Sequence, residues 1–200
     1  IIENESSKIS PSDIPMPYVA YYIHSIYKIS NRYTRASIMR IICQLEINCE
    51  TSIIEPYYFD KIIIQSLIDT SEQTNESDTE KISIFKLIGV LIQVKKILPQ
   101  SIIRGMILFF SDKNCNRSYQ QMILILFAKA LLLVDNLTNV REISEILVNS
   151  LIQKPDDNLT SLLLYIFEKQ STRPIKKIII DLLISSFSAL VDTNANLFNI

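Results

Sequence analysis

The sequence predicts an all-α protein built from helical hairpins that repeat about every 40 residues. The strongest observation is an internal repeat, because the apolar positions of 101–170 coincide when the stretch is shifted by about 40 residues. The matching pairs include Ile103 with Ile143, Ile107 with Leu147, Ile123 with Leu163, Phe127 with Phe167, and Lys129 with Lys169. Apolar residues within each block also recur at the i, i+3, i+4 spacing of a helix. A short polar break divides each copy, which predicts two helices joined by a tight loop.

The N-terminal half contains two predicted helix pairs. Residues 1–12 predict a flexible polar lead-in, and Pro15 and Pro17 fit only the first turn of a helix. Pro99 is expected to end the second pair. The four expected helices lie at about 18–29, 33–47, 57–68 and 81–98.

The longest polar stretch of the chain, 69–80, separates the third and fourth predicted helices. It carries five carboxylates and no basic residue, so we expect a solvated loop. One interpretation is a flexible connector. The other is an acidic docking or phosphorylation segment around Ser71 and Ser77.

The C-terminal half predicts two further pairs and a ninth helix, followed by a tail at 193–200. Asn139 and Glu142 form a plausible capping arrangement, in which Asn139 accepts from a free backbone N–H. The isoleucine triplets 62–64 and 178–180 have high β propensity, but the repeat register places both inside helices. The expected helices lie at about 100–111, 117–134, 140–153, 158–170 and from 173 to about 191.

A period near 40 with two helices per unit resembles the HEAT repeat of the HEAT/armadillo superfamily. The resemblance covers 101–170 and extends back, less cleanly, to Pro17. HEAT units often carry an Asp and an Arg around the loop between their two helices, and in this chain only Asp112 and Arg117 match them. It implies a right-handed α-solenoid of four helix pairs plus one helix over 13–192, taken as an excerpt of a longer array. Tetratricopeptide repeats, with a period of about 34 residues, fit less well.

Composition narrows the function classes. The net charge of −1, from 20 basic and 21 acidic residues, argues against a general nucleic-acid binder. The chain is 48% hydrophobic, yet no apolar run reaches the roughly 18–20 residues of a membrane span. Three cysteines without paired spacing and no apparent signal peptide indicate an intracellular protein, cytoplasmic or nuclear.

The residues of common catalytic and metal sites are sparse. A nucleophilic site would have to use His24, which lies among tyrosines and is interpreted as a packing residue. Cys43 and Cys49 lack the spacing of a zinc site, and no glycine-rich loop could hold a phosphate. We therefore expect no enzyme, no cofactor and no metal.

Surface residues remain as candidates for binding. In solenoids of this type the second helices of successive units line one face. In this sequence polar residues recur at matching positions of those helices. These residues either keep the face soluble or form a row of side chains that binds an acidic or extended partner. A second candidate is a cationic first turn of the ninth helix, where positive charge opposes the helix dipole. The first set is Lys86, Gln93, Lys96, Gln121, Lys129 and Lys169, and the second is Arg173, Lys176 and Lys177.

The function predicted from these observations is a non-catalytic protein–protein interaction scaffold. The first alternative is a transport-receptor or trafficking-adaptor solenoid that binds cargo or a small GTPase. A nucleic-acid-binding solenoid is disfavoured by the charge. The partners are expected to be other proteins or other parts of the same chain, with further helices covering the apolar end at 175–190.

Overall fold

The computed structural model describes residues 15–69, 75–112, 115–153, 157–169 and 173–197, and these ranges contain nine α-helices, one π-helical segment and no strand. The expectation of an all-α protein is confirmed for this part of the chain. Most helix boundaries lie within two residues of those predicted. The elements are α1 (Met16–Ile29), α2 (Arg32–Asn48), α3 (Phe59–Ile68), α4 (Asn75–Val90), η2 (Leu91–Lys95), α5 (Gln100–Phe110), α6 (Arg117–Leu133), α7 (Val140–Gln153), α8 (Asp157–Lys169) and α9 (Arg173–Leu197).

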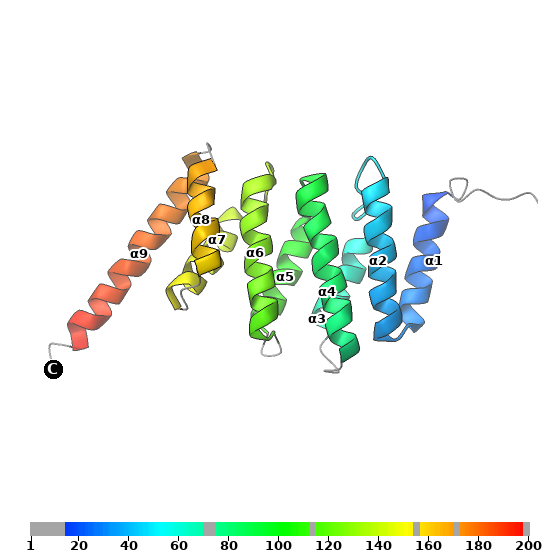
Figure 1. Cartoon of the computed structure of the whole chain (residues 1–200), viewed down its shortest axis with the longest axis horizontal. Helices are drawn as coiled ribbons and strands as arrows, with labels where there is room; N and C mark the ends of the chain where they lie inside the picture. The colour runs from blue at the N-terminus through cyan, green and yellow to red at the C-terminus, as the bar shows by residue number, and fades with distance from the viewer. Residues whose placement is uncertain (1–14, 70–74, 113–114, 154–156, 170–172, 198–200) are drawn as a thin grey trace, which may run out of the picture.

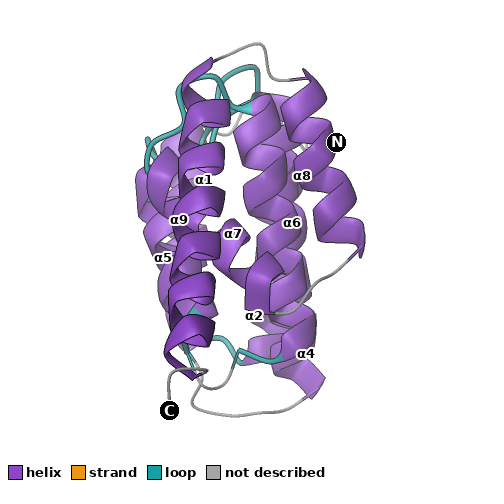
Figure 2. Cartoon of the chain, turned by 90° about the vertical axis from the view of Figure 1, so that its left-hand side faces the viewer, coloured by secondary structure: helices purple, strands orange, loops and turns teal. Residues whose placement is uncertain are grey.

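The helices lie side by side in an elongated array with two layers (Figure 1). Along most of the array a helix packs against its neighbour in sequence and against the helix two places on. The second kind of contact joins α1 with α3, α2 with α4, α3 with α5, α4 with α6, α6 with α8, and α7 with α9. Figure 2 shows α2, α4, α6 and α8 in one layer, with α1, α5 and α9 in the other.

Asparagine side chains begin two of the helices in the α2/α4/α6/α8 layer. Asn31 accepts a hydrogen bond from the backbone N–H of Thr34 at 2.9 Å, and Asn116 accepts one from Tyr119 at 3.0 Å. Each asparagine satisfies one of the backbone donors that a helix leaves unpaired at its first turn. These caps place the starts of α2 and α6.

The predicted cap of α7 takes a different form. The carbonyl of Asn139 accepts from the N–H of Ile143 at 3.0 Å, as expected at a helix start. Its side-chain amide, however, donates to Glu142 Oε2 at 2.7 Å. Asn139 adopts a left-handed conformation with φ of 60°, which asparagine tolerates better than most residues.

The stretch 69–80 is only partly a loop, which corrects the sequence interpretation. α4 begins at Asn75, and the structure buries Glu80 at its sixth position. The first turns of α4 lack the apolar spacing that reveals a helix, but carboxylates there suit the positive end of the helix dipole. Of the two candidate phosphorylation positions, Ser77 lies in α4 and Ser71 is outside the described residues, as is the predicted lead-in 1–12.

Three further boundaries differ from the prediction. α3 begins at Phe59 because Tyr58 adopts a left-handed conformation, with φ of 58°. The fourth helix ends as the π-helical segment η2, after which Lys96 is also left-handed and the N–H of Ile97 donates to the carbonyl of Leu91. α9 continues to Leu197, beyond the expected end near Val191.

A continuous apolar core runs between the two layers. Its largest fully buried side chains are Phe59, Phe109 and Phe127. Both isoleucine triplets lie in helices, α3 and α9, so the repeat register outweighed their β propensity. Gly105 of α5 allows a close approach to α3, because a Cβ there would lie 3.1 Å from Ile64 Cγ1. Within the described residues, no helix has the length and apolar character needed to cross a membrane.

Candidate binding groove

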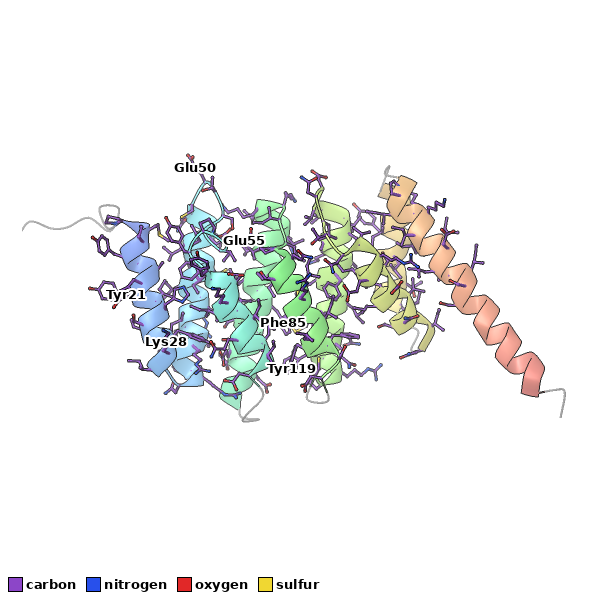
Figure 3. All side chains as sticks on the ribbon, turned by 180° about the vertical axis from the view of Figure 1, so that it is seen from behind. Tyr21, Lys28, Glu50, Glu55, Phe85 and Tyr119 are labelled. Atoms are coloured by element: carbon purple, nitrogen blue, oxygen red, sulfur yellow. The ribbon has the colours of Figure 1, made fainter. Side chains whose placement is uncertain are left out.

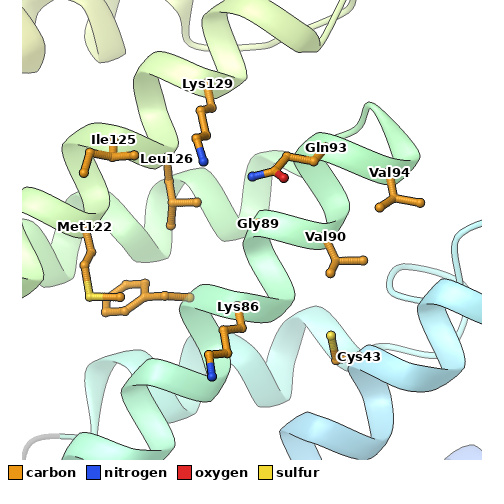
Figure 4. Close-up of a pocket in the computed structure, with 11 residues that line it drawn as sticks. Cys43, Lys86, Gly89, Val90, Gln93, Val94, Met122, Ile125, Leu126 and Lys129 are labelled. Atoms are coloured by element: carbon orange, nitrogen blue, oxygen red, sulfur yellow. The ribbon is translucent and has the colours of Figure 1, made fainter. Parts of the chain in front are cut away.

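A groove opens between α4 and α6, with one wall completed by α2 (Figure 4). Its volume is about 570 Å³. The groove therefore lies on the α2/α4/α6/α8 layer, the face formed by the second helix of each predicted hairpin. It is lined by Cys43, Phe85, Lys86, Gly89, Val90, Gln93, Val94, Met122, Ile125, Leu126 and Lys129.

The floor is made by two matching helical stripes. Besides Phe85, the lining positions on α4 and η2 are 86, 89, 90, 93 and 94, and on α6 they are 122, 125, 126 and 129. Both sets follow the i, i+3, i+4, i+7 spacing of one helix face. Two of the apolar members are well exposed, Val94 at 56% and Ile125 at 38%. The groove therefore presents apolar surface to solvent.

Gly89 opens the centre of this floor. A Cβ built there would meet only Leu126 Cδ2, at 3.9 Å, which is an ordinary contact. Unlike Gly105, Gly89 is therefore not required by close packing. Its effect is to leave space between the two stripes.

Positive charge lies at the two ends of the groove. Lys86 comes from α4 and Lys129 from α6, and Lys129 points toward Gln93 across the groove (Figure 4). None of the described residues that line it is a carboxylate. Burial, and to a lesser degree nearby Glu46, raises the pKa of the Cys43 thiol, so Cys43 contributes a neutral group.

The groove collects three of the nine residues singled out by sequence: Lys86, Gln93 and Lys129. Lys96 and Gln121 are exposed outside it. On α9, Lys177 is exposed and Lys176 is half-buried, while the side chains of Lys169 and Arg173 are outside the described part of the chain. The apolar lining and Gly89 were not predicted from the sequence. The helical spacing of positions 86, 89, 90 and 93, which places them on one face, could have indicated them.

A buried polar cluster lies next to the groove, where α1, α2, α3 and α4 meet. Lys81 donates to the carbonyls of Ser66, Leu67 and Asp69 at the end of α3. Asp69 Oδ2 in turn pairs with Arg35 Nη1 at 2.9 Å. Nearby, the hydroxyl groups of Tyr27 and Ser66 lie 2.6 Å apart in a hydrogen bond. This cluster ties the first two helix pairs together.

Glu80 belongs to this cluster but is only partly satisfied. Its side chain is 2% exposed, and its Oε1 atom has no hydrogen-bond partner. Burial raises the pKa of this carboxyl, a shift opposed by Ser66, Lys81 and the arginines. A carboxyl whose folded pKa exceeds its unfolded value stabilises the fold most below the unfolded pKa. That stability is lost as the pH rises through the folded pKa.

We therefore expect Glu80→Gln to be more stable than the wild type at about pH 7, by about 1 kcal/mol, with the gain disappearing near pH 4. Urea unfolding at a series of pH values measures the difference. Glu55→Gln, which changes an exposed carboxylate, is the matched control. A Glu80→Gln gain that does not depend on pH would contradict this explanation.

Other candidate positions serve packing. His24 Nε2 lies 2.9 Å from the carbonyl oxygen of Tyr57, and its ring stacks on Phe59 with 5.6 Å between centroids, which agrees with the structural interpretation of this histidine. Phe85, Phe109 and Tyr119 form an aromatic cluster, and Phe85 also lines the groove; Phe85 and Tyr119 are labelled in Figure 3. The three cysteines are free thiols. Within the described residues, no group of three or more His, Cys, Asp or Glu residues could hold a metal ion.

The two ends of the array also expose apolar side chains. On and beside α1 these are Tyr18, Tyr21, Tyr22, Ile29 and Tyr33, and Figure 3 shows Tyr21 directed away from the array. On α9 they are Ile180 and Ile184. Figure 1 shows the C-terminal part of α9 leaning away from the other helices.

Comparison of this chain with known protein families, with curated proteins and with solved structures finds no match in any of the three.

Proposed function

We propose that this chain is a HEAT-like, right-handed α-solenoid segment that acts as a non-catalytic scaffold for protein–protein interaction inside the cell. The two helical layers and the contacts between helices two places apart support the solenoid arrangement. In such an array each helix pair adds a strip of surface, so binding sites form between successive units. The groove between α4 and α6 is such a site.

The groove's composition is the observation that carries this proposal. It combines a volume of about 570 Å³ with an apolar floor and only three long polar side chains, Lys86, Gln93 and Lys129. Sites that bind ligands are typically concave and mostly apolar, with a few polar groups that orient the ligand. The exposure of Val94 and Ile125 leaves apolar area that a bound segment would cover.

Blocking the groove at Gly89 tests the proposal. In Gly89→Leu the Cβ meets only an ordinary contact, and the remaining carbon atoms enter the groove. Leucine is also a better helix former than glycine by up to about 1 kcal/mol, so the helix should not be weakened. Gly89→Ala is the matched control, because it shares the gain in helix propensity and adds a single methyl group.

The measurement begins with selection of binders from a random peptide display library against the wild-type chain. We expect selected peptides to bind Gly89→Ala nearly as well as the wild type and Gly89→Leu at least about tenfold more weakly, a loss of about 1.4 kcal/mol. Failure to select any peptide, or equal binding to Gly89→Leu, would contradict the proposal. Thermal unfolding of the three proteins verifies that the fold is retained.

A further inference from the structure

We infer that the occupant of the α4/α6 groove is an acidic amphipathic helix of a partner protein, whose apolar face enters the groove between two carboxylates. This inference rests on the proposed function and specifies the chemistry of the partner. It is drawn from the length of the groove, the position of its charges and the absence of internal partners for those charges among the described residues.

The length of the groove matches a short helix. The stripe on α4 and η2 runs from Lys86 to Val94, and its α-helical part, from Lys86 to Val90, spans four residue steps, or about 6 Å at 1.5 Å per residue. The α6 stripe from Met122 to Lys129 spans seven steps, or about 10.5 Å. About two turns of a partner helix would lie along both stripes, with its side chains entering the space over Gly89.

The charges of the groove determine which helix fits. Lys86 and Lys129 lie at opposite ends of the apolar floor (Figure 4). Within the described part of the chain, neither Lys86 nor Lys129 takes part in an ion pair such as those of Arg35 with Asp69 and of Arg141 with Glu145. Carboxylates about seven positions apart on a helix would be separated by about 10.5 Å, which is also the length of the α6 stripe that ends at Lys129.

One internal carboxylate close to the groove, Glu46, faces the core. Glu46 of α2 lies close enough to influence Cys43, but it is fully buried and its Oε2 accepts from the backbone N–H of Ile53 at 2.9 Å. It therefore does not neutralise Lys86 or Lys129. Carboxylates supplied by a partner would be complementary to the groove, and complementary charge favours both association and specificity.

A nucleic acid fits this surface less well. Binding a phosphate backbone requires several cations along a track, whereas the groove offers two lysines separated by apolar side chains. The chain as a whole has a net charge of −1. The apolar floor instead matches the i, i+3, i+4 anchors of an amphipathic helix.

Three designed helical peptides that differ only in charge test the inference. Each carries leucines on one face and, at two positions about seven apart, glutamate, glutamine or lysine. Fluorescence anisotropy with the full chain should show binding in the order glutamate, glutamine, lysine, with about tenfold between the first and the last. Added salt should weaken only the glutamate peptide.

Charge reversal in the protein provides the stricter measurement. In the double variant Lys86→Glu/Lys129→Glu the order of the peptides should reverse, so that the lysine peptide binds best. Arg104→Glu, which reverses an exposed charge on α5 in the other layer, should leave the order unchanged. A glutamate peptide with a central proline, which breaks the helix, should lose binding at least about tenfold.

The failures of the two proposals are distinguishable. If the glutamate and glutamine peptides bind equally and Gly89→Leu abolishes both, the groove docks a helix but the acidic partner is wrong. If the proline peptide binds as well as its parent, the occupant is not a helix. If none of the designed peptides binds, the inference is overturned, and the display selection with Gly89→Leu decides separately whether the groove binds peptides at all.

Discussion

Replacing Lys81 with methionine is expected to lower the free energy of unfolding by about 3 kcal/mol, because its ammonium group satisfies the last carbonyls of α3. Lys81 is 3% exposed, and its Nζ donates to Ser66, to Leu67 at 2.7 Å and to Asp69 at 3.2 Å. Methionine fills a similar volume but donates nothing. The buried carbonyls of Ser66 and Leu67 would lose this donor.

The methionine substitution also has a stabilising effect that opposes this loss. Burial lowers the pKa of Lys81 to about 8, so the fold bears a cost for keeping this ammonium ion charged, and methionine removes that cost. Each buried carbonyl left without a partner costs about 1–3 kcal/mol, and more than one carbonyl is affected. Glu80 would also lose its nearest cation. We therefore expect the free energy lost with the hydrogen bonds to exceed the free energy gained by no longer burying the charge.

Urea unfolding followed by circular dichroism measures this change. Lys86→Met is the matched control, because Lys86 lies on the same helix with its side chain exposed, and we expect a change within about 0.5 kcal/mol. Equal or greater stability of Lys81→Met would show that the cost of burying the charge dominates.

Phe109→Ala is expected to lower the free energy of unfolding by about 4 kcal/mol, the usual range for a fully buried phenylalanine being 3–5 kcal/mol. Phe109 is 2% exposed and packs against the rings of Phe85 and Tyr119, with centroid distances of 6.5 and 5.8 Å. These rings come from α4, α5 and α6. The cavity would therefore loosen three helices together and distort the groove above them.

The same ring also contacts Lys81, whose Nζ lies 5.0 Å from the ring centroid. Phe109→Leu keeps most of the apolar volume and removes this cation–π contact, so we expect a smaller loss, about 1–2 kcal/mol. Phe110→Ala, next in sequence but only half-buried, is the control and should cost less than Phe109→Ala. Similar losses for Phe109→Ala and Phe110→Ala would mean that the aromatic cluster is not the centre of the core.

Hydrophobic spacing predicted most of the helices correctly because a helix that packs on one side leaves a periodic record in the sequence. The boundaries of α5, α6 and α7 follow from Pro99, Asn116 and the polar breaks between blocks. α4 was the exception. Its first turns are charged, and they are helical because Glu80 and Lys81 contribute to a buried cluster with α2 and α3, which no local pattern reveals.

The candidate site was predictable in part. Register alone placed Lys86, Gln93 and Lys129 on the face formed by the second helices. It did not indicate that Cys43 of α2 would join them, or that Gly89 would leave the floor open. Those facts depend on how closely α4 approaches α2 and α6, and helix spacing is set by side chains on both partners.

The sequence by itself determined that the chain is helical, where most helices begin and end, and which face of each is apolar, because these properties depend on residues within a few positions of one another. Tertiary structure decided which helices touch, which charges are buried and where the surface is hollow. Lys81 and Lys86 illustrate the difference. They are the same residue type on one helix, yet contacts with α3 bury the first while the second lies at the rim of a groove.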